Sequence, residues 1–242
     1  MLSIKQNKLI KSLQLKKYRK EYGLFVVEGK KNVVELLNSD YKIEILVATN
    51  AVIDEIYSNK YHVGEVISAG ESVIASLSTL ENNTTCLAVA YMGVPRLDSY
   101  KSGISIVLDG IQDPGNLGTI IRSADWFGIS QVICSSDCVD FFNPKTISAT
   151  MGSFTRVVPL YTDIAAYLSG VSCQVYGTYM DGISIFETSI KEGVIVFGNE
   201  ANGIDAKLQK YITKKITIPR IGSGNSLNVA VAASITMAHV SR

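Results

Sequence analysis

Cysteine and histidine are scarce in this chain, and their placement argues against most metal and disulfide chemistry. The 242 residues include 4 Cys and 2 His. No Cys-x-x-Cys pair occurs, and the cysteines are scattered through apolar stretches at Cys86, Cys134, Cys138 and Cys173. Such spacing favours buried free thiols in a reducing cytoplasm over zinc ligands or a disulfide framework. We therefore expect no metal site and a cytoplasmic protein.

Long hydrophobic runs are also missing, although 47% of the residues are hydrophobic. No apolar stretch reaches the ~20 residues that a bilayer-spanning helix needs. The N-terminus is basic but has no continuous apolar core followed by small residues, so it does not resemble a secretory signal. We expect neither a membrane protein nor an exported one.

Acidic residues are nearly absent from the first 31 positions. This segment contains nine Lys or Arg and two acids, Glu21 and Glu28, which gives it a charge of +7. The whole chain carries +1, so the remainder carries −6. A basic end on a nearly neutral chain suggests a surface for a polyanion such as nucleic acid. The alternative is the solvated face of an amphipathic helix, and the charge alone does not separate the two.

Apolar runs alternate with helical patterns along the chain, which predicts an α/β fold. Residues 1–94 form a small first domain, with strands expected at 24–29, 43–49, 62–68 and 87–92. Gly, Pro, Ser and charged residues predict a linker at 95–103. Residues 104–242 form a second domain, with strands expected at 104–110, 131–136, 157–161, 171–180, 194–200 and 216–219, and helices at 117–127, 143–152, 163–169, 204–211 and 226–240. Its strands are apolar throughout, as in a parallel sheet that is covered on both faces.

Three polar, glycine-bearing loops follow strands of the second domain and carry the side chains best suited to chemistry. The first contains Asn116 and Arg122, the second contains Glu200, and the third contains Ser226 and Asn228. Ligands of open α/β sheets bind beyond the carboxyl ends of the strands. We therefore expect the three loops to form a single site.

Each loop also has a purely structural interpretation. Arg122 could pair with Asp125 on its own helix, and Asn116 could cap that helix. Glu200 could be an ordinary helix-capping acid, although an unpaired carboxylate is costly to bury at a strand end. The third loop does not match a dinucleotide fingerprint, because Leu227 stands where the third glycine is required.

The last predicted helix, at 226–240, is apolar or small on nearly every face. Such a helix is usually buried all round. We expect it to pack inside the domain, against a second subunit, or both.

Together, the three loops resemble the motifs of one family. Residues 116–128 have the pattern NxGxxxRSADxFG, residues 198–204 GNExxGI, and residues 218–235 IPxxGxxxSLNVAVAASI. This set resembles the SpoU (TrmH) branch of the SPOUT methyltransferases and covers residues 104–242 densely. Residues 16–29, KKYRKEYGLFVVEG, resemble that family's N-terminal substrate-binding domain more weakly.

The resemblance implies transfer of a methyl group from S-adenosylmethionine to the 2′-hydroxyl of an RNA ribose, a group that DNA lacks. It also implies a parallel-sheet domain with a deep trefoil knot, a homodimer that shares its active sites, and no need for a metal. Knots are rare exceptions among protein folds, so periodicity could not have predicted this one.

Carried over by position, the resemblance assigns a catalytic set, a cofactor pocket and an RNA surface. The catalytic set is Asn116, Arg122, Glu200, Ser226 and Asn228. The pocket for S-adenosylmethionine would be lined, largely through backbone groups, by Thr178, Tyr179, Phe197, Gly198, Asn199, Ile218, Ser226 and Leu227. The RNA phosphates would contact Lys16, Lys17, Arg19 and Lys20.

Arg122 suits a cationic role better than the role of a base, because a guanidinium stays protonated in proteins. It would bind the target phosphate and stabilise the developing alkoxide. Ser226 and Asn228 would orient the ribose by hydrogen bonds. The sequence departs from the family pattern at two places. Ala201-Asn202 replaces a glycine-containing pair, and Arg220 replaces an apolar residue after the proline. Neither is a proposed catalytic position, but Arg220 bears on the shape of the pocket.

A separate N-terminal domain favours ribosomal RNA as the substrate, because transfer-RNA enzymes of this branch tend to carry short helical extensions. The family link implies a guanosine or a uridine of the large subunit. A transfer RNA substrate stays open, and so does a non-catalytic RNA-binding protein of ribosome assembly. Loss of Arg122, Glu200 or Asn228 would favour that last alternative, and all three are present.

Overall fold

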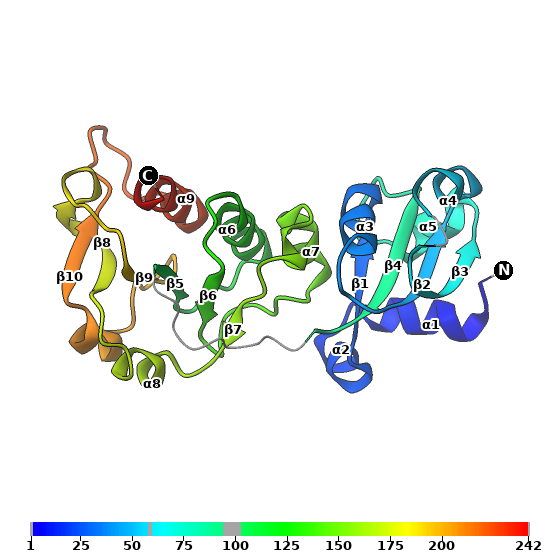
Figure 1. Cartoon of the computed structure of the whole chain (residues 1–242), viewed down its shortest axis with the longest axis horizontal. Helices are drawn as coiled ribbons and strands as arrows, with labels where there is room; N and C mark the ends of the chain where they lie inside the picture. The colour runs from blue at the N-terminus through cyan, green and yellow to red at the C-terminus, as the bar shows by residue number, and fades with distance from the viewer. Residues whose placement is uncertain (1, 58–59, 94–102, 242) are drawn as a thin grey trace. The chain divides into compact units, whose positions relative to one another are not determined.

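The computed structural model describes residues 2–57, 60–93 and 103–241 (Figure 1). The chain divides into two compact units. The first comprises Met1–Val94 and Asp140–Thr155, and the second comprises Pro95–Val139 and Arg156–Arg242. Most of the predicted linker at 95–103 lies outside the described residues, so the domain boundary stays a prediction.

The first unit contains a four-stranded mixed sheet in the order β1-β4-β2-β3. Its strands, β1 (Leu24–Glu28), β2 (Ile43–Ala48), β3 (Val63–Ser68) and β4 (Cys86–Tyr91), lie close to the predicted positions. β4 is antiparallel to β1 and β2, whereas β2 and β3 are parallel. The helices that accompany them are α1 (Ile4–Ser12), α2 (Lys16–Tyr22), α3 (Lys30–Leu37), α4 (Asn50–Ile56) and α5 (Glu71–Leu77).

A segment from the middle of the chain, Asp140–Thr155, packs on β1 within the first unit. It contains α7 (Pro144–Thr150) and a short 3-10 turn, Ser153–Thr155. The ring of Phe25 on β1 lies 4.7 Å from the ring of Phe142 and 6.1 Å from that of Phe154, measured between centroids. Phe25 and Phe154 are fully buried, so this aromatic cluster is part of the unit's core.

The second unit is built on a six-stranded sheet in the order β10-β8-β9-β5-β6-β7, and its recorded strand pairs are all parallel. The strands are β5 (Ile104–Leu108), β6 (Gln131–Cys134), β7 (Leu160–Tyr161), β8 (Val175–Ser184), β9 (Gly193–Phe197) and β10 (Lys214–Thr217). The helices are α6 (Pro114–Trp126), α8 (Ile164–Ser169) and α9 (Val229–Val240), with 3-10 turns at Ile185–Glu187 and Ala206–Tyr211. The central strand β9 is buried along its whole length, as an uninterrupted apolar run predicts. The predicted α/β class with a parallel sheet is confirmed.

Several elements of the second unit differ from the prediction, most of all β8 and the predicted helix at 204–211. β8 starts later and runs further than the predicted strand at 171–180, and the predicted helix at 204–211 is a 3-10 turn. The trefoil knot depends on how the chain is threaded, which the strand order does not report, so it stays a prediction. Among the described residues, none of the helices combines the length and the apolar character needed to cross a membrane.

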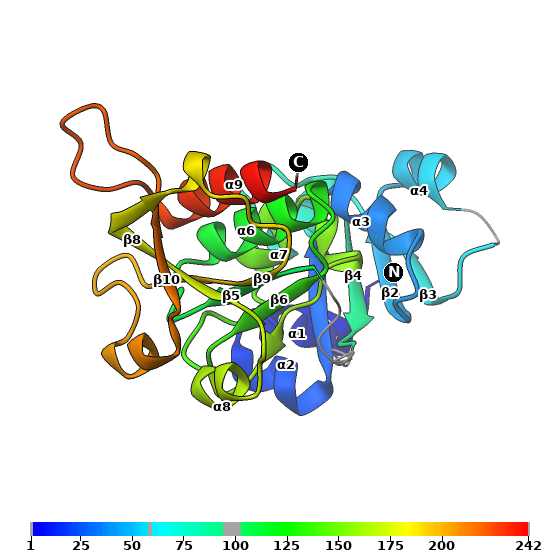
Figure 2. The same cartoon turned by 60° about the vertical axis from the view of Figure 1, so that its left-hand side comes forward.

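Helices α6 and α9 lie side by side in the second unit (Figures 1 and 2). The hydroxyls of Ser123 on α6 and Ser234 on α9 are 2.7 Å apart. Ala233 and Met237 of α9 are fully buried, but Val231 remains 46% exposed. Within this chain, α9 is therefore less buried on the side of Val231 than on the side of Ala233 and Met237.

Candidate active site

Side chains from the three loops meet in a row of hydrogen bonds. The Asn116 amide donates through Nδ2 to Glu200 Oε1 at 2.6 Å. The Asn228 amide donates through Nδ2 to Asn116 Oδ1 at 2.9 Å. These loops follow β5, β9 and β10, whose carboxyl ends lie at the same edge of a parallel sheet. The predicted convergence of the three loops is thus present in the structure.

The caps of α6 and α9 explain how two members of this row are oriented. Asp113, not Asn116, caps α6, because its Oδ1 accepts from the Asn116 backbone N–H at 2.7 Å. The capping role considered for Asn116 is therefore wrong, and its amide points to Glu200 and Asn228 instead. Asn228 caps α9 through Oδ1, which accepts from the Ala230 N–H at 2.9 Å. Because Asn228 is the cap, α9 begins at Val229, later than predicted. The Nδ2 of Asn228 is then free to donate to Asn116.

The second loop holds Glu200 through a tight turn. Asn199 and Gly203 exchange backbone hydrogen bonds of 3.0 and 2.9 Å, and the Asn199 amide donates to the Gly110 carbonyl of the first loop at 2.6 Å. A Cβ on Gly198 would lie 2.1 Å from the Gly203 backbone, so only glycine fits there. Glu200 caps no helix in this turn, and its recorded partner is Asn116. The structural interpretation of Glu200 is therefore wrong.

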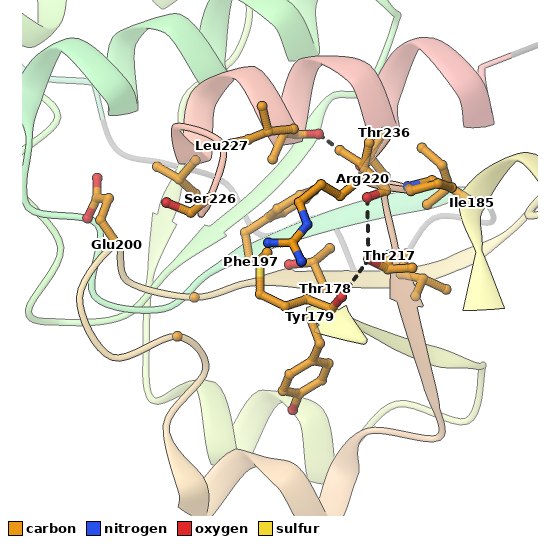
Figure 3. A pocket seen from close by; sticks show the side chains of 18 of the residues that line it. Thr178, Tyr179, Ile185, Phe197, Glu200, Thr217, Arg220, Ser226, Leu227 and Thr236 are labelled. Carbon is orange, nitrogen blue, oxygen red and sulfur yellow. Dashed lines mark hydrogen bonds between the residues drawn. The ribbon is translucent and has the colours of Figure 1, made fainter. Parts of the chain in front are cut away.

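A cavity of about 600 Å³ opens beside this row, between β8, β9, β10 and α9 (Figure 3). All eight predicted cofactor-binding residues line it: Thr178, Tyr179, Phe197, Gly198, Asn199, Ile218, Ser226 and Leu227. Of the predicted catalytic residues, Glu200 and Ser226 also line the cavity. The sequence motifs did not indicate Ile185 on the 3-10 turn or Thr236 on α9, which also line the cavity.

Arg122 stands apart from the row and from the cavity wall. It is exposed on α6, and at 3.6 residues per turn it lies about 240° around the helix from Asn116. Its suggested structural partner, Asp125, is held by Arg156, whose Nη2 lies 2.9 Å from Asp125 Oδ2. No Arg122–Asp125 pair is recorded between these two described residues, so the structural interpretation of Arg122 is also unsupported.

The first loop is hydrogen-bonded to Cys138, whose thiol interacts with that of Cys134. The backbone N–H of Ile111 donates to Cys138 Sγ at 3.2 Å, and the N–H of Gly110 donates to Ser135 Oγ at 2.9 Å. Hydrogen bonding, first of all from the Cys134 thiol, lowers the pKa of Cys138 to about 7. The sequence motifs did not indicate these contacts to the first loop, because Ser135 and Cys138 follow a different strand, β6.

Arg19, one of the predicted RNA-binding residues, is buried in an ion pair. The side chain of Arg19 is 2% exposed, and its Nη2 pairs with Asp140 Oδ2 at 2.6 Å. Its Nη1 donates to the carbonyls of Leu13 and Gln14, both at 2.8 Å. Arg19 therefore holds the first unit together and cannot contact a phosphate in this structure. The lysines predicted with it, Lys16, Lys17 and Lys20, are exposed.

Comparison with known proteins identifies the family. The SpoU rRNA methylase family profile matches residues 103–238, which include all three loops. The chain belongs to the SpoU rRNA methylase family. A second profile, the MRM3-like substrate binding domain, matches residues 5–88. The two predicted family resemblances are therefore confirmed.

Relatives of this SpoU family member match it over nearly its whole length. The 23S rRNA (guanosine(2553)-2'-O)-methyltransferase RlmP of Bacillus subtilis (strain 168) is 31% identical, and the match covers 95% of this chain and 93% of RlmP. The AdoMet-bound rRNA methyltransferase from Sinorhizobium meliloti has a TM-score of 0.84 at 30% identity, covering 99% of this chain and 96% of that one. A protein assigned to the TrmH family of RNA methyltransferases, from Porphyromonas gingivalis, has a TM-score of 0.88 at 36% identity, with coverage of 99% and 98%.

Proposed function

We propose that this SpoU family member transfers a methyl group from S-adenosylmethionine to a ribose 2′-hydroxyl of large-subunit ribosomal RNA. The observation that carries this proposal is the row Asn228–Asn116–Glu200 at the edge of the cavity. The row offers polar groups for a sugar, and the cavity beside it offers room for a nucleoside cofactor. A guanosine is the target that the name of RlmP suggests. A ribosomal RNA substrate would place the protein in the cytoplasm.

The cavity suits S-adenosylmethionine in size and lining. Its volume of about 600 Å³ falls within the usual range for small-molecule sites, roughly 300–1,000 Å³. Phe197 and Ile216 give it an apolar floor that fits an adenine ring, and the loop from Ile218 to Leu227 brings backbone groups to its rim. The cofactor would supply a methyl group on a sulfonium, which is already a strong electrophile.

The protein's part would be to position the ribose hydroxyl and to assist the loss of its proton. Asn116 uses both ends of its amide within the row, so its orientation does not depend on the substrate. Glu200 uses Oε1 for Asn116, which leaves Oε2 as an acceptor for the hydroxyl or its proton. Ser226, on the cavity wall, would orient the ribose by a hydrogen bond, and Arg122 would bind the target phosphate and stabilise the developing alkoxide.

A direct assay tests this function. Purified protein with labelled S-adenosylmethionine should methylate protein-free large-subunit ribosomal RNA, and nucleoside digestion should yield a 2′-O-methylnucleoside. Transfer RNA incubated in parallel should stay unlabelled. Label found on a base would overturn the proposed reaction. Label found on transfer RNA alone would overturn the proposed substrate.

We further propose that RNA docks on the exposed lysines of α2. Lys16, Lys17 and Lys20 are exposed on this seven-residue helix, and the Lys17 ammonium lies 5.6 Å from the ring centre of Tyr18. Phosphate contacts release counterions, so RNA affinity should fall steeply with salt concentration.

Neutralising this helix is expected to weaken RNA binding and to flatten its salt dependence. In the variant Lys16→Gln/Lys17→Gln/Lys20→Gln, the slope of log affinity against log salt should fall by about one for each lysine that contacts a phosphate. Fluorescence anisotropy at several salt concentrations measures this slope. The matched control is Lys31→Gln/Lys42→Gln/Lys60→Gln, three lysines of the same unit outside α2. Equal slopes in both variants would remove α2 from the RNA surface.

We also propose that the active protein is a homodimer. Three large apolar side chains are exposed on neighbouring elements of the second unit: Trp126 on α6, Phe186 on the 3-10 turn and Val231 on α9. Arg122 is exposed on a different face of α6 from Asn116, as expected if it serves the site of a partner.

A charge placed on this apolar surface is expected to prevent association. Val231→Glu should give a monomer by light scattering and should lose most methyl transfer, because a shared site would be incomplete. Val73→Glu, at a similarly exposed position of the first unit, should leave the mass unchanged. A wild-type protein that is monomeric at assay concentrations contradicts the proposal.

A further inference from the structure

Arg220 places a positive charge in the cavity wall at a position where the family pattern has an apolar residue. Among the described residues that line the cavity, Arg220 carries the one positive charge and Glu200 the one negative charge. Figure 3 shows the Arg220 side chain in the middle of the lining residues, with Glu200 at the left of the view. The remaining lining residues are neutral, so these two are the formal charges among the described residues of the lining.

The guanidinium of Arg220 is oriented by one hydrogen bond, and the residue is exposed. Its Nη1 donates to the Gly224 carbonyl at 3.3 Å, a bond within its own loop. No ion pair of Arg220 is recorded with any acid in the described part of the chain. Since a guanidinium has five N–H donors, most of them remain available to a ligand.

We propose that Arg220 binds the carboxylate of the methionine part of S-adenosylmethionine, and thereby makes the cavity select nucleosides that carry this carboxylate. The proposal rests on the proposed function. The cofactor has one anionic group, the carboxylate, and two cationic groups, the ammonium and the sulfonium. A guanidinium repels the cations and can bind a carboxylate through two parallel hydrogen bonds.

An RNA phosphate is the competing occupant for Arg220. The position of Arg220 favours the cofactor, because Arg220 lines the same cavity as all eight predicted cofactor-binding residues. Titration of the cofactor analogues without RNA, and a separate titration of RNA with the same variants, distinguish the two occupants.

The test pairs two ligands with two substitutions. S-adenosylhomocysteine has the amino-acid carboxylate but no transferable methyl group, whereas 5′-methylthioadenosine lacks the amino-acid part and keeps the nucleoside. Isothermal titration calorimetry measures the affinity of each ligand for the wild-type protein, for Arg220→Met and for Arg220→Lys. Arg220→Met keeps an extended side chain and removes the charge, and Arg220→Lys keeps the charge but loses the planar fork.

Arg220→Met is expected to weaken S-adenosylhomocysteine roughly tenfold to a hundredfold, the effect of losing a charge-assisted hydrogen bond. Arg220→Lys should lie between wild type and Arg220→Met. The affinity for 5′-methylthioadenosine should change less than twofold in both variants. Lys210→Met, which removes an exposed charge outside the cavity wall, should bind both ligands as wild type does.

Two results would overturn the inference while leaving the function intact. An equal loss for both ligands means that Arg220 shapes the nucleoside site and does not bind the carboxylate. Unchanged affinity for S-adenosylhomocysteine, with weaker RNA binding, assigns Arg220 to a phosphate. If wild-type protein binds neither S-adenosylhomocysteine nor S-adenosylmethionine, the proposed function fails first and the inference fails with it.

Discussion

Arg122→Ala is expected to lower the rate of methyl transfer roughly 100- to 1,000-fold, the effect of removing a group that stabilises developing charge. Arg122 is exposed on α6, and Asp125 beside it is paired with Arg156. A long cation without a recorded partner among the described residues is suited to a phosphate and to the alkoxide at the site of a partner subunit, as the proposed homodimer requires. Arg122→Lys should keep part of the rate, because the charge remains and the forked geometry is lost.

Kinetics and binding together identify the role of Arg122. Arg122 does not line the cavity, so S-adenosylhomocysteine should bind Arg122→Ala with wild-type affinity. The rate constant for transfer should fall with saturating RNA as well as with limiting RNA. Lys210→Ala, which removes another exposed cation of the second unit, should have wild-type rates. Near wild-type turnover in Arg122→Ala or Arg122→Lys would exclude an essential role for this residue.

Asp140→Ala is expected to destabilise the first unit by about 3 kcal/mol, because it leaves the buried guanidinium of Arg19 without its counter-ion. The side chains of Arg19 and Asp140 are 2% and 16% exposed. The two backbone carbonyls that accept from Arg19 offset part of the loss, and they do not supply a negative charge. Because the two units need not unfold together, hydrogen exchange of β1 amides is the suitable measure of the free energy of unfolding.

An exposed ion pair of the same unit gives the comparison. Lys30 and Glu55 lie 2.5 Å apart, but their side chains are 41% and 61% exposed. Lys30→Ala should therefore cost at most ~0.5 kcal/mol. The double variant Arg19→Met/Asp140→Leu should recover much of the stability, because it removes both buried charges. If Asp140→Ala costs no more than Lys30→Ala, the Arg19–Asp140 pair does not stabilise the unit.

The site could be predicted from the sequence because its main features are local. Apolar runs such as Gly193–Phe197 indicate strands covered on both faces, and the loops after parallel strands must meet at one edge of the sheet. The positions of Asn116, Glu200 and Asn228 after such strands therefore implied that they would lie together. The cofactor-binding residues came from the family resemblance, and the structure places all of them around one cavity.

Two of the features that could not be predicted depend on partners far away in the chain. Arg19 looks like one more basic residue among lysines, and its partner Asp140 lies 121 positions later. The antiparallel pairing of β4 with β1 and β2 could not be predicted either, because an alternating pattern of strands and helices does not indicate strand direction. The capping of α6 by Asp113 was missed because Asp113 and Asn116 are both good capping residues, and only the structure shows which of them accepts the bond.

Mapping of ribose methylation in cells tests the central claim most directly. Ribosomal and transfer RNA from a strain that lacks this gene are compared with RNA from the same strain carrying either the wild-type gene or the Arg122→Ala variant. The account predicts that one 2′-O-methylated nucleoside of the large-subunit RNA disappears, and that the wild-type gene restores it while Arg122→Ala does not. Unchanged 2′-O-methylation across the ribosomal RNA of the deletion strain would contradict the account.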